Sequence, residues 1–95
     1  MIQSFADKGT ERFFYEGRCP APWRAFADVL ARKLDMIDAA VTLNDLRSPR
    51  GNRLEALKGN RAGQMSIGIN DQWRICFVWS EDGPMEVEVV DYHRG

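Results

Sequence analysis

The last third of this sequence alternates between apolar and polar residues, and that pattern constrains the fold more than any other feature. Residues 65–69, 73–79 and 85–90 place large apolar side chains at every second position, and turn-forming sequences at 70–72 and 81–84 separate them. Alternation with a period of two is typical of a strand with one buried face. Short turns between such runs favour antiparallel pairing. We therefore expect an antiparallel meander of strands.

The N-terminal half has helical spacing instead. Its apolar residues recur at steps of three and four: Trp23, Phe26, Leu30, Leu34, Ile37 and Val41. This spacing predicts a helix from Pro22 to about Ala40 that packs on the core through one apolar face. The charged residues of the segment are expected mainly away from that face: Arg24, Asp28, Arg32, Lys33 and Asp35.

Shorter elements complete the expected fold. Asp7–Glu16 fits a short helix with both phenylalanines turned inward and Gly17 at its end. Ile2–Phe5 is expected to be an edge strand, and Leu54–Leu57 a further short strand. The expected fold class is α+β, with N-terminal helices packed on one face of a small antiparallel sheet, in a single domain over residues 1–95.

Composition narrows the class of protein. Hydrophobic residues make up 44% of the chain and charged residues 28%, which is typical of a soluble globular domain. Apolar stretches are far shorter than the roughly 20 residues of a membrane span, and Asp7 and Lys8 interrupt any N-terminal targeting segment. We therefore expect a cytoplasmic protein without a membrane partner. Because Cys19 and Cys76 are the only cysteines, we expect reduced thiols, no metal and no organic cofactor.

The charge is unevenly distributed. The net charge is −1, yet residues 47–63 carry five basic side chains against Glu55 alone. Four of these basic side chains are expected to contact a polyanion such as RNA: Arg50, Arg53, Lys58 and Arg61. A concentrated basic segment indicates a polyanionic partner. A solvated loop with scattered arginines is the alternative.

The C-terminal sequence supplies groups for proton transfer. His93, the only histidine, follows Asp91 and Tyr92, and its ordinary pKa near neutrality suits a general acid or base. A histidine without a role is the alternative, but the preceding strand favours a function. Arg74 lies between Trp73 and Ile75 in an apolar strand, so it needs an anionic partner. That partner is either a structural acid, Asp91 or Glu88, or a phosphate.

Basic groups, a histidine and a tyrosine suit RNA cleavage without a metal. The ribose 2′-OH is then the nucleophile, and the enzyme needs only a base, cations for the phosphate and an acid for the leaving oxygen. DNA lacks the 2′-OH and cannot react in this way.

Several motifs carry a resemblance to a known family. They are Leu54-Glu-Ala-Leu-Lys-Gly59, Arg61-Ala-Gly-Gln64, Ile69-Asn-Asp-Gln-Trp-Arg-Ile75 and Val87-Glu-Val-Val-Asp-Tyr-His93. The chain resembles the HigB branch of the RelE toxin superfamily over nearly its whole length. The resemblance implies a RelE-like fold and a toxin of a type II toxin–antitoxin system that cleaves messenger RNA in the ribosomal A site. It also implies a HigA-type helix-turn-helix antitoxin, with operator DNA contacted only through that antitoxin.

The resemblance also assigns roles to residues. Lys58, Arg61 and Arg74 would stabilise the phosphate, and the C-terminal part of the site would be Asp91, Tyr92 and His93. Glu55 stands where relatives often carry a second histidine, so it is either a base or a surface glutamate paired with Lys58. Met65 stands where relatives often carry an aromatic residue or histidine, and it cannot move protons. A non-catalytic protein that binds its antitoxin or RNA is the alternative function.

Overall fold

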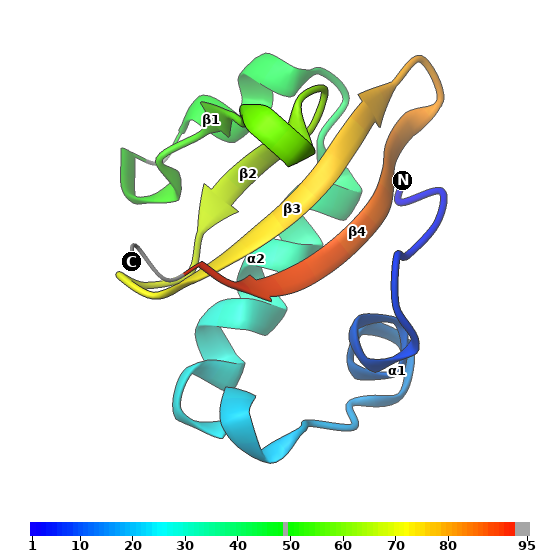
Figure 1. Cartoon of the computed structure of the whole chain (residues 1–95). Helices are drawn as coiled ribbons and strands as arrows, with labels where there is room; N and C mark the ends of the chain where they lie inside the picture. The colour runs from blue at the N-terminus through cyan, green and yellow to red at the C-terminus, as the bar shows by residue number, and fades with distance from the viewer. Residues whose placement is uncertain (49, 93–95) are drawn as a thin grey trace.

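The computed structural model describes residues 1–48 and 50–92, with no description of the Arg50 side chain. One four-stranded antiparallel sheet has the order β1-β2-β3-β4, with β1 at Glu55–Ala56, β2 at Met65–Gly68, β3 at Trp73–Ser80 and β4 at Gly83–Asp91. Helix α2 crosses behind the sheet, and α1 lies below the N-terminal segment (Figure 1). The α+β expectation is confirmed, including the short strand near residue 55.

Tight turns fix the register of the sheet. Gly68 of β2 pairs with Arg74 of β3, which in turn pairs with Val90 of β4. Two residues further along these strands, Ser66 of β2 lies opposite Cys76 of β3. Because side chains alternate between the two faces of a strand, these residues share the face away from α2.

The helical segment divides into two parts. A 3-10 helix, η1, covers Ala21–Phe26, and the α-helix α2 covers Ala27–Ala39. The two are separate because Phe26, at φ −128° and ψ 20°, lies outside the helical conformation, which breaks the single helix that the spacing predicts. The apolar face is nevertheless the buried one, and it joins the sheet in one core: Trp23, Phe26, Leu30, Leu34, Ile37, Ile67, Ile75, Phe77 and Val87.

Two expectations for this segment are wrong. Val41 is 83% exposed because α2 ends at Ala39 and the chain turns away before the apolar face can continue. Lys33 is only 5% exposed instead of facing solvent. Its ammonium group donates hydrogen bonds to the carbonyl oxygens of Gly68, at 2.7 Å, and Gly51, at 3.2 Å. These two carbonyls compensate for the loss of water around a buried charge.

The N-terminal segment runs beside β4. Phe5 forms an isolated parallel bridge with Val87, and the Gln3 amide donates to the carbonyl of Pro84 at 2.7 Å. The segment therefore lies at the sheet edge as expected, although one bridge does not make a strand. Helix α1, Lys8–Glu16, follows at once, capped by the Asp7 side chain and ended by Gly17 at φ +72°.

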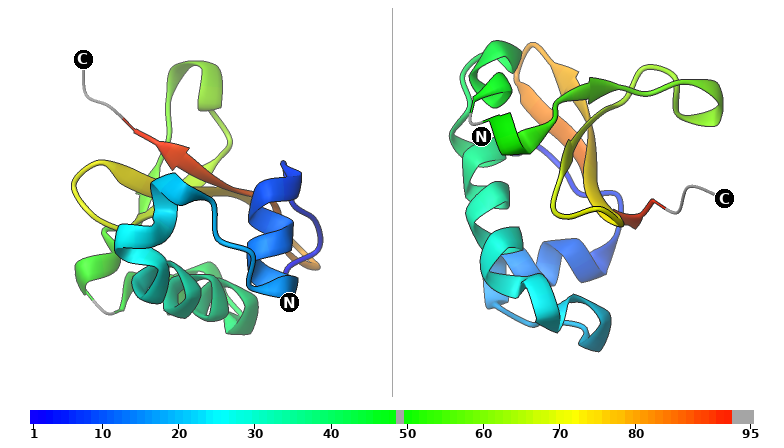
Figure 2. Two further views of the ribbon diagram at one scale, coloured as in Figure 1. Left: turned by 90° about the horizontal axis from the view of Figure 1, so that it is seen from below. Right: turned by 90° about the vertical axis from the view of Figure 1, so that its left-hand side faces the viewer.

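The sheet face away from α2 carries the segment 57–64, which projects from the sheet on the side opposite the helices (Figure 2, right). Its short 3-10 helix, η4, covers Gly59–Arg61. The remaining 3-10 helices, η2 at Leu43–Arg47 and η3 at Arg50–Asn52, connect α2 to β1. Among the described residues, no helix combines the length and the apolarity needed to cross a bilayer.

Candidate active site

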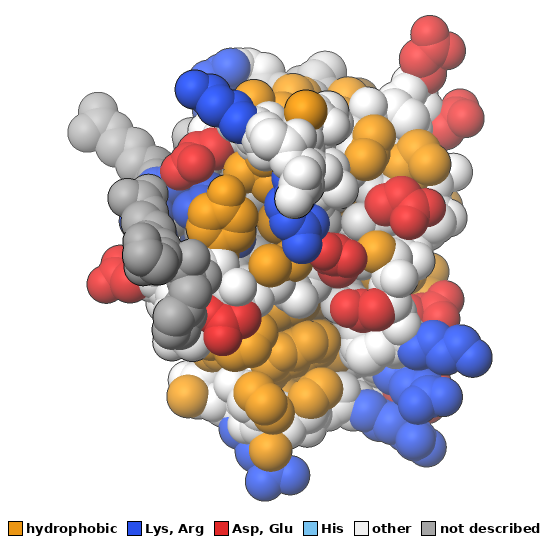
Figure 3. All heavy atoms as spheres, in the orientation of Figure 1, with side chains coloured by type: hydrophobic (Ala, Val, Ile, Leu, Met, Phe, Trp, Pro, Cys, Tyr) orange, Lys and Arg blue, Asp and Glu red, His pale blue; other side chains and the backbone are white. Residues whose placement is uncertain are grey.

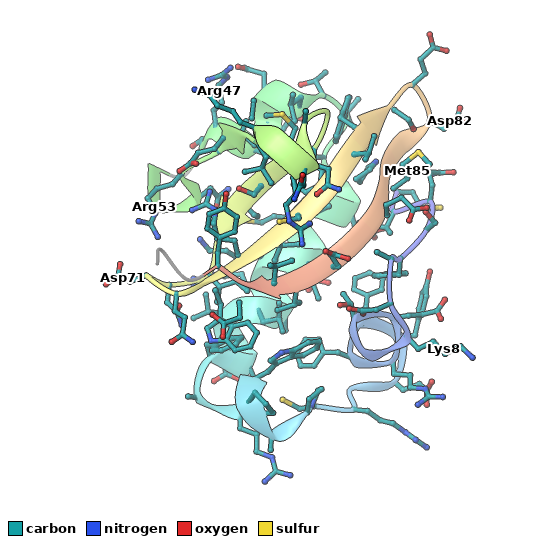
Figure 4. The ribbon with its side chains drawn as sticks, viewed as in Figure 1. Lys8, Arg47, Arg53, Asp71, Asp82 and Met85 are labelled. Atoms are coloured by element: carbon teal, nitrogen blue, oxygen red, sulfur yellow. The ribbon has the colours of Figure 1, made fainter. Side chains whose placement is uncertain are left out.

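A cavity of about 260 Å³ opens at the end of the sheet where β2 passes into β3. Five side chains from four parts of the chain line it: Arg53, Glu55, Asp71, Arg74 and Tyr92. Arg53 and Asp71 lie on the same edge of the molecule, beside the start of β3 (Figure 4). The cavity thus holds two guanidinium groups, two carboxylates and a phenol.

Arg74 is the most constrained of these residues. It is 6% exposed, and its Nε donates to Ser66 Oγ at 2.7 Å while its Nη2 donates to the carbonyl oxygen of Arg53 at 2.6 Å. Glu55 Oε1 lies 3.7 Å from the same Nη2. Desolvation by burial lowers the pKa of Arg74, and Glu55 opposes that effect. An arginine remains charged in proteins, so the cavity contains a fixed buried cation.

The structural partners expected for Arg74 are engaged elsewhere. Glu88 accepts from Arg61 Nη1 at 3.0 Å, and both carboxylate oxygens of Asp91 accept from Gln72 Nε2 at 3.1 Å. Of the alternatives for Arg74, a structural acid is present, but it is Glu55 and not Asp91 or Glu88. Arg74 instead leans towards β2, where its cross-strand neighbour Gly68 leaves space.

Glu55 is exposed at the edge of the sheet, as expected for a surface glutamate, but its ion pair is with Arg74 and not with Lys58. A carboxylate at this position faces both the buried cation and the cavity.

Arg53 belongs to the cavity through both its backbone and its side chain. Its φ of 46° turns the carbonyl towards Arg74, and its Nη2 donates to the carbonyl of Asn70 at 3.0 Å. Left-handed backbone is unfavourable for a residue with a side chain. These hydrogen bonds hold Arg53 in that conformation.

The C-terminal candidate residues do not all reach the cavity. Tyr92 continues the pairing of β4 through its amide, which donates to the Gln72 carbonyl at 2.7 Å, and its side chain lines the cavity. Asp91 pairs with Trp73 in the register, so its side chain leaves the strand on the opposite face from Arg74. His93 lies outside the described residues, as does the side chain of Arg50.

The remaining basic candidates lie on the projecting segment 57–64. Lys58 is exposed just before η4. Arg61 is half-buried and holds the segment against the sheet through Glu88 and Gln64, both within 3.0 Å. Neither residue is among the side chains that line the cavity. On the face drawn in Figure 3, basic side chains gather on the left, where Figure 4 labels Arg47 and Arg53, and again at the lower right near Lys8.

Sequence reasoning missed Ser66 and Asp71. Both follow from the hairpin register: a turn at 70–72 pairs Gly68 with Arg74, which puts Ser66 diagonally beside Arg74 on the same face. Asp71 lies at the tip of that turn. Both cysteines are free thiols as expected, and burial raises the pKa of the Cys76 thiol.

Comparison with known proteins identifies the family. Residues 3–93 match the family model described as "RelE-like toxin of type II toxin-antitoxin system HigB". The chain belongs to this family. It is 38% identical to "Toxin HigB-1" of Vibrio cholerae over 99% of both chains. It is also 31% identical to "Endoribonuclease HigB" of Proteus vulgaris, covering 98% of this chain and 100% of that protein.

The resemblance to the HigB branch is thereby confirmed, and the chain is a HigB-like toxin of a type II toxin–antitoxin system. Such a system includes an antitoxin partner. In this HigB-like toxin, a buried arginine, a carboxylate and a tyrosine meet in the cavity at the end of β2. That set places a buried cation beside a carboxylate and a phenol.

Proposed function

We propose that this HigB-like toxin is an endoribonuclease that cleaves messenger RNA in the ribosomal A site by attack of the ribose 2′-OH. The observation that carries the proposal is the buried guanidinium of Arg74, which lines a polar cavity together with Glu55 and Tyr92. A fixed cation in a partly dry site stabilises the charge that develops on a phosphate during cleavage. The relative named "Endoribonuclease HigB" supports the same reaction.

The proposed reaction uses no protein nucleophile. The 2′-oxygen bonds to phosphorus while the bond from phosphorus to the 5′-oxygen breaks, leaving a 2′,3′-cyclic phosphate and a 5′-OH. A base removes the 2′-OH proton, and an acid protonates the leaving 5′-oxygen. Glu55 would act as the base, and its position in the lining of the cavity beside Arg74 supports this role. His93 and Tyr92 are the candidates for the acid.

The other candidate residues would bind RNA or position the reacting groups. Asp91 would hold Gln72 in its turn, because its carboxylate accepts hydrogen bonds from the Gln72 side chain. The Gln72 carbonyl accepts from the Tyr92 amide, so Asp91 would thereby also fix the position of Tyr92. Lys58, Arg61, Arg50 and Arg53 would bind the RNA backbone. Arg61 would do so with only part of its guanidinium, because Glu88 and Gln64 occupy Nη1.

The proposal includes the partners and the place of action. The antitoxin would be a HigA-type helix-turn-helix protein, and operator DNA would be contacted only through it. The ribosome would supply the messenger RNA, which places the toxin in the cytoplasm. One domain over residues 1–95 would carry these functions without a metal or organic cofactor.

The test uses ribosomes programmed with a short messenger RNA and a matched RNA carrying one 2′-deoxy sugar at the cleavage position. We expect the first RNA to be cut to a 2′,3′-cyclic or 3′-phosphate, and the second to bind and stay intact. Equal cleavage of both RNAs would rule out attack by the 2′-OH.

A second candidate function is a binder that does not cut. The ion pair between Glu55 and Arg74 favours it, because a carboxylate oxygen that contacts a cation is less available to accept the 2′-OH proton. Expression of the gene alone under tight control separates the two. Growth arrest that the antitoxin reverses supports the enzyme, and normal growth supports the binder.

A further inference from the structure

The end of β2 brings three cationic groups around one glycine. Gly68 pairs with Arg74 across the β2–β3 hairpin. A methyl group built on its Cα would lie 3.0 Å from Arg53 Nη2 and 3.2 Å from Arg74 Nη1. On the other side, Lys33 Nζ donates to the Gly68 carbonyl at 2.7 Å.

We propose that Gly68 is the floor of a two-arginine phosphate site, because its missing side chain lets the guanidinium groups of Arg53 and Arg74 converge on one phosphate. Since both nitrogens lie close to the same point, they are at most about 6 Å apart. Two nitrogens that each donate a hydrogen bond of about 2.8 Å to a different oxygen of one phosphate are separated by a similar distance. The ligand class is a phosphate mono- or diester, and its identity as the RNA backbone rests on the proposed function.

Hydrogen bonding leaves donors available for that ligand. Arg74 uses Nε and Nη2 for Ser66 and the Arg53 carbonyl, and Arg53 uses Nη2 for Asn70. Within the described part of the chain, Arg74 Nη1 and Arg53 Nε have no acceptor. Donors in a partly buried cluster without an acceptor suit an incoming anion.

The local charge points the same way. The pKa of Lys33 is lowered first by desolvation and then by the positive charges of Arg32, Arg53 and Arg74. Glu55 is 3.7 Å from Arg74 and offsets only part of this positive charge. An anion bound over Gly68 would relieve the remaining repulsion.

Lys33 is a positioning residue in this arrangement. Its ammonium group joins the Gly68 carbonyl to the Gly51 carbonyl, so it ties the end of β2 to the loop that carries Arg53. Lys33 extends from α2 and acts on the site through these two backbone carbonyls, and it would not contact the phosphate itself.

The test compares Gly68→Ala with Gly51→Ala, which adds the same methyl group near Arg53 but meets nothing within 4 Å. Each protein, purified free of antitoxin, is titrated with inorganic phosphate and with adenosine 3′-monophosphate. The NMR signals of the arginine Nε–H groups report binding. We expect the signals of Arg53 and Arg74 to move together in the wild-type protein and in Gly51→Ala.

In Gly68→Ala the affinity should fall about tenfold, equivalent to about 1.4 kcal/mol and close to the lower end of the range for a hydrogen bond to a charged group. The fold should survive, because the atoms near the new methyl group are the ends of side chains. Arg53→Gln should weaken binding as well. Wild-type affinity in both variants, or movement of only one arginine signal, would overturn the proposal. Phosphate binding that depends on Gly68 in a protein that cuts no RNA would refute the proposed function and leave this site standing.

Discussion

Replacing Arg74 with lysine separates a chemical role from a structural one. The guanidinium makes hydrogen bonds to Ser66 Oγ at 2.7 Å and to the Arg53 carbonyl at 2.6 Å, and turns Nη1 towards Gly68. A lysine has a single ammonium group and cannot donate to Ser66, to the Arg53 carbonyl and towards Gly68 at the same time. We expect Arg74→Lys to lose about 1.5–3 kcal/mol of unfolding free energy, the contribution of one hydrogen bond to a charged group. Cleavage should fall at least about a hundredfold, as when one donor to a developing charge is removed.

Ser66→Ala is the matched control. It removes the same buried hydrogen bond and keeps the guanidinium, so we expect a similar loss of about 1–3 kcal/mol in stability. Its cleavage rate should remain within roughly tenfold of wild type, since the donors for phosphate remain. Urea unfolding and cleavage of ribosome-bound messenger RNA measure the two quantities. Equal loss of cleavage in both variants, or near-normal cleavage by Arg74→Lys, would refute the reasoning.

Three further predictions concern other groups. His93→Ala should slow cleavage by roughly 10²–10⁴-fold at unchanged stability, as loss of a general acid or base does; full toxicity at equal expression would exclude His93. Neutralising Arg53 and Lys58 should weaken ribosome binding and reduce the slope of log affinity against log salt by about one for each charge, measured by sedimentation across a salt series; an unchanged slope would contradict an electrostatic contact. Because the pKa of Lys33 is lowered in the folded state, stability should rise as pH rises towards 10.5, and Lys33→Met should lack this rise in urea unfolding; identical pH profiles would show that Lys33 is not desolvated.

The sheet was predictable because its turns are local. Two short turns in a strictly alternating sequence fix which residues face each other, so Arg74 and the segment before Tyr92 could be placed on neighbouring strands. The same logic reaches Ser66 once the hairpin register is known. The part of the site that follows from the sequence is the part made by neighbouring strands.

The rest depends on contacts between distant segments. Lys33 is charged, although it lies three residues after Leu30 and four before Ile37, at the edge of the apolar face. The carbonyls of Gly51 and Gly68, which accept hydrogen bonds from its ammonium group, make its burial possible. The direction of the Arg74 side chain depends on the empty space at Gly68, whereas charge alone suggested Asp91 or Glu88. Val41 continues the apolar period, but it lies beyond the helix end predicted near Ala40, and the chain there turns away from the core.

The pairing of the N-terminal segment with β4 has a consequence for the order of synthesis. The Ser4 hydroxyl accepts from the Glu86 amide, and these residues are 82 positions apart. A ribosome therefore makes the helices long before the strands on which they pack, and the first residues wait for their hydrogen-bond partners until residues 84–87 have been made. Contacts of such separation are slow to form. A toxin built in this way completes its cavity only after Tyr92 has been added, so a nascent chain that has not reached Tyr92 carries the helices without a complete cavity.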